Sequence, residues 1–110
     1  MLPAAKRLVH RAEFTHVVRR GRRARRGPFL MYLIKESASH PARFGFIVGR
    51  SVGNAVVRHR ITRRLRHIAA EQDLVGASVV VRVLPGADKA SFAQLNRDFS
   101  RALQQLRAGG

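Results

Sequence analysis

Apolar residues recur every three or four positions in three stretches of the chain, which predicts amphipathic helices at about residues 12–20, 53–66 and 92–106. The third helix has the strongest signal, because Ser91 and Gln94 have the spacing of an N-terminal capping box. One face of this helix is apolar and is expected to pack in the core: Phe92, Leu95, Phe99, Leu103 and Leu106.

Three shorter runs, 29–34, 44–48 and 78–84, are rich in branched and aromatic residues and predict strands. The turn-prone segment 36–43 separates the first two runs, which we expect to pair antiparallel. The basic run at 19–26 precedes them, and its repeated charge suits an exposed edge strand. The predicted order is therefore helix, strands, helix, strand, helix.

The second predicted helix is unusually rich in arginine and carries no acidic residue between Arg50 and Ala70. Its apolar stripe comprises Val57, Ile61, Leu65 and Ile68. Its opposite side comprises His59, Arg60, Arg63, Arg66 and His67. A guanidinium group binds two phosphate oxygens in a bidentate manner and also stacks on bases, so this side is expected to bind a polyanion. The alternative is a merely solvated helix face, although such faces normally mix charges of both signs.

The whole chain is strongly basic, with 22 Lys and Arg against six Asp and Glu and a net charge of +16 on 110 residues. Self-repulsion at this level favours a polyanionic partner, and nucleic acid is the first candidate. An anionic membrane surface is the alternative, but the longest apolar run, 28–34, is far below the roughly 20 residues that span a bilayer. With no secretory signal and no cysteine, the chain is expected to be a cytoplasmic protein with a single domain, 1–110.

Few residues are suited to catalysis. The sequence has no cysteine nucleophile, no glycine-rich phosphate loop and no metal-ligand spacing. Its six acidic residues are scattered, whereas two-metal nucleases need clustered carboxylates. The five histidines lie on separate segments or among arginines. We therefore expect no catalytic residue, no metal site and no cofactor held by the protein's side chains.

The segment RSVGNAVVRHRITRRLRHI, residues 50–68, closely resembles the signature of the bacterial ribonuclease P protein subunit, in which Gly-Asn-Ala-Val leads into an Arg-Asn-Arg motif. RLVHRAEFTHVVRRGRR, at 7–23, resembles the N-terminal segment of that family. FLMYLI, RFGFIVGR and VVVRVLPGA resemble its strands, so the resemblance covers nearly the whole chain. It implies an α+β fold, a two-layer α/β sandwich like the second domain of ribosomal protein S5, with an unusual left-handed βαβ crossover.

In this family a large RNA subunit is the ribozyme, which uses divalent metal ions to hydrolyse precursor tRNA and free its mature 5′ end. The resemblance implies an accessory subunit of that endoribonuclease, which binds the catalytic RNA and the 5′ leader of precursor tRNA. It further implies that the holoenzyme requires Mg²⁺ and that the protein is monomeric outside the ribonucleoprotein.

The resemblance also assigns site residues. Expected contacts to the RNA subunit are Arg50, Ser51, Asn54, Arg58, His59, Arg60, Arg63, Arg64 and Arg66. His59 stands where the family motif has Asn. The leader is expected to contact Phe14, Val18 and Tyr32, with Val18 where the family often has a second aromatic residue. Phe14 could equally be a core residue, whereas the Tyr32 hydroxyl favours a solvent-exposed edge of the cleft that holds the leader in this family.

Two other classes of function stay open. A basic ribosomal or RNA-assembly protein of the same fold would share the charge and size but would not be expected to carry GNAVVRHR at this position. A self-sufficient ribonuclease would need a catalytic cluster that the sequence lacks. The RNA that co-purifies with the chain distinguishes these classes.

Overall fold

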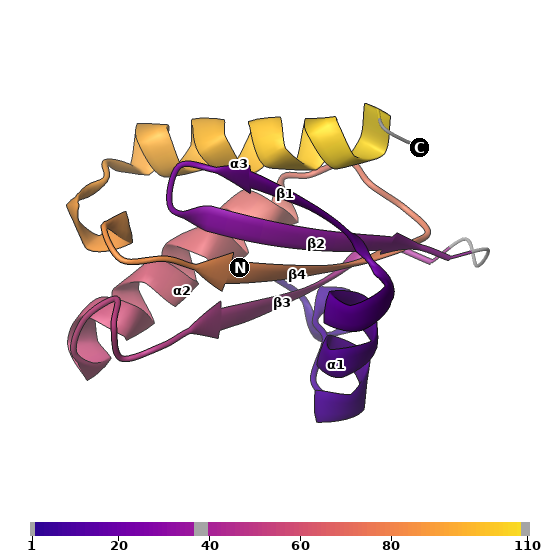
Figure 1. Cartoon of the computed structure of the whole chain (residues 1–110), viewed down its shortest axis with the longest axis horizontal. Coiled ribbons are helices and arrows are strands. Elements are labelled where there is room, and N and C mark those ends of the chain that lie inside the picture. Colours follow the sequence, from indigo (N-terminus) through magenta and orange to yellow (C-terminus); the bar gives the residue numbers. More distant parts are fainter. Residues whose placement is uncertain (1, 37–39, 109–110) are drawn as a thin grey trace.

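The computed structural model describes residues 2–36 and 40–108. All the predicted helices and strands are present, although the predicted turn at 36–43 lies partly outside the described residues. The elements are η1 (Ala4–Lys6), α1 (Arg11–Arg20), β1 (Arg22–Arg26), β2 (Phe29–Lys35), β3 (Arg43–Val48), α2 (Ala55–Ala70), β4 (Ala77–Val83), η2 (Ala87–Lys89) and α3 (Phe92–Ala108), as shown in Figure 1.

The four strands form one sheet in the order β1-β2-β4-β3. The basic run forms the edge strand β1, as predicted. The predicted antiparallel pairing of 29–34 with 44–48 is wrong, because β4 lies between β2 and β3 and runs antiparallel to the first and parallel to the second. The physical reason is that β4 is apolar on both faces: Val79, Val80 and Val81 are each fully buried, which suits a central strand.

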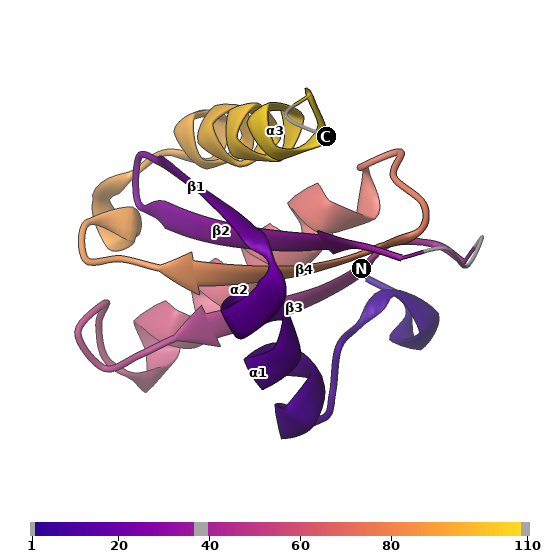
Figure 2. The ribbon, with the colours of Figure 1, turned by 45° about the vertical axis from the view of Figure 1, so that its right-hand side comes forward.

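Helices α2 and α3 cover one face of the sheet, and α1 packs against part of the other (Figures 1 and 2). Alternate residues of β2 serve the two faces: Met31 and Leu33 join the core under α2 and α3, whereas Tyr32 joins a smaller cluster under α1. The connection from β3 through α2 to β4 passes behind the sheet in Figure 1 and is left-handed. The predicted α+β sandwich and its crossover are therefore confirmed.

The capping box of α3 forms as predicted. The backbone amide of Gln94 donates to Ser91 Oγ at 3.1 Å, and the backbone amide of Ser91 donates to Gln94 Oε1 at 2.9 Å. Four of the five residues on its apolar stripe are buried, but Phe92 is 40% exposed. Its assignment to the core is wrong, because Phe92 stands in the first turn of the helix and packs beside His67 of α2. Periodicity identifies a face of a helix but not how far along the helix the core extends.

Gly21 ends α1, and its amide donates to the Val17 carbonyl at 2.7 Å, which confirms it as the predicted C-terminal cap. Its backbone is extended, so a left-handed conformation is not the reason for glycine here. A Cβ at this position would lie 2.5 Å from the Val17 oxygen, and only glycine allows the chain to turn so closely into β1.

Candidate nucleic-acid interface

Helix α2 is held rigidly at its start and along its inner face. The Val57 amide donates to Asn54 Oδ1 at 2.9 Å, so Asn54 is the N-cap residue. Ile61, Leu65 and Ile68 are at most 1% exposed and dock the helix on the sheet, while Val57 is only half-buried. The predicted apolar stripe is thus present, and the cap uses the Asn54 oxygen, which leaves its amide nitrogen for an outside contact.

The arginines of α2 divide into two groups by exposure. Arg63 is exposed, whereas Arg58, Arg60, Arg64 and Arg66 are half-buried. The Nε atoms of Arg58, Arg60 and Arg66 are buried and have no hydrogen-bond partner among the residues that the structure describes. These side chains therefore lie along the protein surface with their aliphatic stems packed, which limits the orientations of each guanidinium group.

No acidic side chain among the described residues forms an ion pair with this face. Within 2–36 and 40–108, ion pairs join Arg43 to Glu13 and to Glu36, and His40 to Glu36, but none involves an arginine of α2. The remaining predicted contacts of the RNA subunit, Arg50, Ser51 and His59, are exposed around the same helix. The result is a basic surface on a rigid element, which attracts an anionic partner.

Two hollows meet at α2. The first, of about 420 Å³, is lined by the outer face of the helix between His59 and His67. The second, of about 230 Å³, lies between the N-terminal segment, β3 and α2, and includes Phe14 among its lining residues. Thr62 and Arg66 line both hollows. The fold thus brings Phe14, predicted to bind the leader, beside the surface predicted to bind the RNA subunit.

Phe14 is half-buried, between the core and the surface. Its ring packs on Gly45 of β3, where a Cβ would lie 2.4 Å from Phe14 Cζ. Glycine at position 45 is therefore required for the close approach of α1 to the sheet. This packing fixes one edge of the ring and leaves the remainder at the hollow that Arg7 and Arg66 also line.

Tyr32 is largely covered by the protein, and its predicted contact with the leader stays a prediction. The residue is only 7% exposed and packs in the cluster under α1 with Leu8, Val17 and Val80. Val18 is half-buried against the same cluster. The physical reason is that α1 covers this part of the sheet, so the Tyr32 ring has little open surface.

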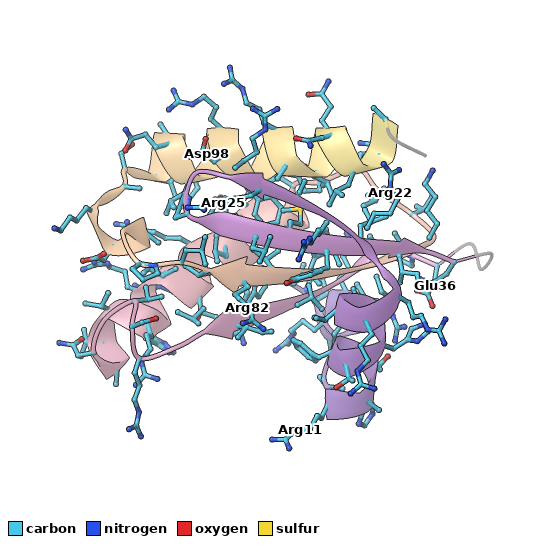
Figure 3. All side chains as sticks on the ribbon, in the orientation of Figure 1. Arg11, Arg22, Arg25, Glu36, Arg82 and Asp98 are labelled. Carbon is cyan, nitrogen blue, oxygen red and sulfur yellow. The ribbon has the colours of Figure 1, made fainter. Side chains whose placement is uncertain are left out.

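Sequence reasoning missed a basic row across the uncovered part of this sheet face. Leu30 of β2 stands in register with Arg25 of β1 on one side and with Arg82 of β4 on the other. Both arginines are exposed, and Figure 3 labels them on these strands. Arg23 lies next along β1, opposite Tyr32. A single arginine within the apolar run of β4 was the available signal, but only the strand order shows that it joins β1 on one face.

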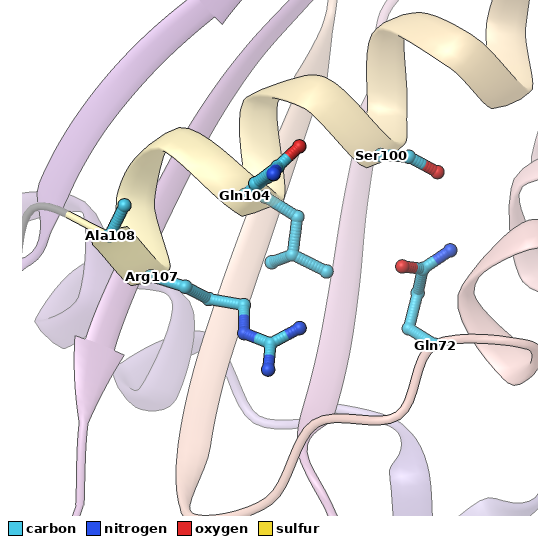
Figure 4. Close-up of a pocket in the computed structure, with 6 residues that line it drawn as sticks. Gln72, Ser100, Gln104, Arg107 and Ala108 are labelled. Atoms are coloured by element: carbon cyan, nitrogen blue, oxygen red, sulfur yellow. The ribbon is translucent and has the colours of Figure 1, made fainter.

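The hollow in Figure 4 lies between α3 and the segment that follows α2. Its polar lining comprises Gln72, Ser100, Gln104 and Arg107, none of which is an acid or base suited to proton transfer near neutral pH. In the part of the chain that the structure describes, no group of three or more potential metal ligands is present. No helix among the described residues is long and apolar enough to cross a membrane.

Comparison with known proteins gives a consistent result. Residues 2–107 match the family model described as Ribonuclease P. The ribonuclease P protein component of a Nocardioides species is 51% identical, over 99% of this chain and 96% of the relative. That of Streptomyces bikiniensis is 45% identical, over 100% of this chain and 98% of the relative.

Solved structures share the fold. A mutant RNase P protein of Staphylococcus aureus, described as defective in mRNA degradation activity, superposes with a TM-score of 0.84 at 21% identity, over 94% of this chain and 89% of that chain. The RNase P protein of Thermotoga maritima superposes with a TM-score of 0.80 at 21% identity, over 90% of this chain and 96% of that chain. At this identity the structural likeness establishes the architecture alone.

Proposed function

The chain belongs to the ribonuclease P protein family, and we propose that it is the protein subunit of a ribonuclease P ribonucleoprotein that removes the 5′ leader of precursor tRNA. In this proposal it binds the catalytic RNA through α2 and the leader through the sheet face beside α1. It works in the cytoplasm and is a monomer until it joins the RNA.

The observation that carries the proposal is the uncompensated basic face of α2. A buried stripe and the Asn54 cap hold this helix in place, so its arginines are positioned before any partner arrives. Each phosphate that they neutralise releases counterions, which favours binding. A merely solvated face would not need half-buried arginine stems and would normally carry acids as well.

The second RNA surface is assigned to the opposite face of the sheet. Single strands bind where a basic groove follows the backbone and rings offer stacking surfaces. Arg23, Arg25 and Arg82 supply exposed charge on this face, and Phe14 supplies the partly open ring at its edge. In this assignment Val18 and Tyr32 support the surface from beneath rather than contact the leader.

We assign the hydrolytic step to the RNA subunit and its Mg²⁺ ions. The protein's part is electrostatic: its arginines lower the repulsion between the phosphates of two RNA molecules that must lie close together. This should matter most when Mg²⁺ is scarce, because cations and arginines then compete less for the same phosphates.

Reconstitution tests the proposal. Precursor tRNA cleavage is measured with the cognate RNA subunit alone, the chain alone and both together, over a range of Mg²⁺ concentrations. We expect the chain alone to be inactive and the mixture to exceed the RNA alone, most strongly at low Mg²⁺. Cleavage at the mature 5′ end by nuclease-free chain alone, or no stimulation at any Mg²⁺ concentration, would contradict the proposal.

A further inference from the structure

Phe92 and His67 form an aromatic pair at the surface, where α2 and the start of α3 meet. The ring centroids are 5.8 Å apart and the ring planes are tilted by 57°. Phe92 is 40% exposed, whereas the other four residues of its apolar stripe are at most 2% exposed. The Phe92 ring is therefore an apolar surface that the protein itself leaves partly open.

This pair adjoins the hollow of α2. His67 lines one end of that hollow of about 420 Å³, and the other lining residues are His59, Thr62, Arg63 and Arg66. The lining thus combines two imidazole rings with two guanidinium groups and contains no acid. An apolar ring beside such a surface suits a partner that has a flat aromatic part and a negative charge.

An unpaired nucleotide has both features. Proteins recognise unstacked RNA bases by stacking them on aromatic side chains and on arginine planes, while cationic groups bind the adjoining phosphates. A protein partner would need acids to match the arginines and would gain little from the two imidazoles. The chemistry of the lining therefore favours RNA.

We propose that Phe92 and His67 form a stacking site for one unpaired nucleobase of the RNA subunit, with Arg63 bound to a neighbouring phosphate. This inference rests on the proposed binding of the RNA subunit by α2, and it extends that surface to the first turn of α3. It also explains why an aromatic residue is placed in that turn without being buried.

The test uses full-length chain and the cognate RNA subunit. Phe92→Leu keeps an apolar side chain and helix propensity but removes the ring, and we expect it to weaken RNA affinity about tenfold. The salt dependence of its affinity should not change, because no charge is lost. Val75→Ala is the matched control, because Val75 is also apolar and 66% exposed. Val75 precedes the start of β4, whereas Phe92 follows its end, so the Val75→Ala variant should bind the RNA as the wild type does.

A second variant supplies a direct signal. The chain has no tryptophan, so Phe92→Trp places a single indole at the site. We expect this variant to bind the RNA with near wild-type affinity and its fluorescence to be quenched on binding, as a stacked base requires. Unquenched fluorescence in the bound state would overturn the stacking site.

The outcomes separate this inference from the proposed function. Wild-type affinity of folded Phe92→Leu, together with weakened binding of Arg60→Ala, would overturn the stacking site and leave α2 as the RNA surface. Wild-type RNA affinity of both variants would overturn both the stacking site and the proposed RNA surface on α2. Loss of a self-association in Phe92→Leu with unchanged RNA affinity would assign the ring to a protein contact and likewise overturn the stacking site.

Discussion

Glu13 of α1 accepts a hydrogen bond from Arg43 of β3, with 2.6 Å between Oε2 and Nη1. Arg43 Nη2 also lies 3.4 Å from Ser78 Oγ, and Ser78 in turn donates to Glu36 Oε1 at 2.6 Å. This network joins α1 to the sheet next to Phe14, which directly follows Glu13. The ring that we assign to the leader surface is therefore positioned partly by an ion pair.

A double-mutant cycle on Glu13 and Arg43 should show their coupling. The two side chains are 26% and 31% exposed, so solvent screening limits the interaction to about 1 kcal/mol. Glu13→Ala, Arg43→Ala and the double variant are compared by urea denaturation, with Asp73→Asn as a control at an exposed acid. Strict additivity of the two single changes would show that the ion pair does not hold α1.

Arg60→Ala should weaken binding to the RNA subunit. If Arg60 neutralises one phosphate, the slope of log affinity against log salt should fall by up to about one unit. Arg97→Ala removes the same charge from the exposed side of α3 and serves as the control. Because Arg60 is half-buried, circular dichroism must first show that the variant is folded. An unchanged slope of log affinity against log salt in folded protein would mean that this face of α2 is merely solvated.

Tyr32→Ala should destabilise the fold by about 3 to 5 kcal/mol, the usual cost of removing a buried ring. Tyr32→Phe keeps the ring and should be nearly as stable as the wild type. Urea denaturation measures both, and precursor tRNA binding is then compared for leaders of increasing length. If the Tyr32→Ala variant is as stable as the wild type and its loss of precursor tRNA affinity grows with leader length, Tyr32 is instead a direct leader contact.

Arg25→Ala and Arg82→Ala should each lower the holoenzyme's affinity for precursor tRNA with a leader, but not for mature tRNA. The two arginines flank Leu30 on the sheet face that we assign to the leader. Arg22→Ala is the control, because Arg22 lies on the same strand in register with Leu33, whose side chain faces α2 and α3. Equal losses of affinity for leaderless tRNA would mean that Arg25 and Arg82 contact a part of the RNA other than the leader.

Several features of the site were predictable from residues close together in the sequence. The capping box of Ser91 and Gln94 and the apolar stripe of α2 both formed, because caps and helical faces depend on residues within a few positions. The GNAVVRHR segment likewise indicated the family before any contact was known, and residues 2–107 match it. Its RNA contacts remain predictions.

The sequence by itself determined which segments become helices and strands, where α3 begins, and that one helix presents arginines on its outer side. Only the tertiary structure decided that β4 separates β2 from β3, that Tyr32 is covered while Phe92 is open, and that Arg25 and Arg82 share a row. The physical reason is the range of the interactions. Helical spacing and capping act between neighbours in the chain, whereas strand order and burial depend on which distant segments pack together, and no local pattern specifies that choice.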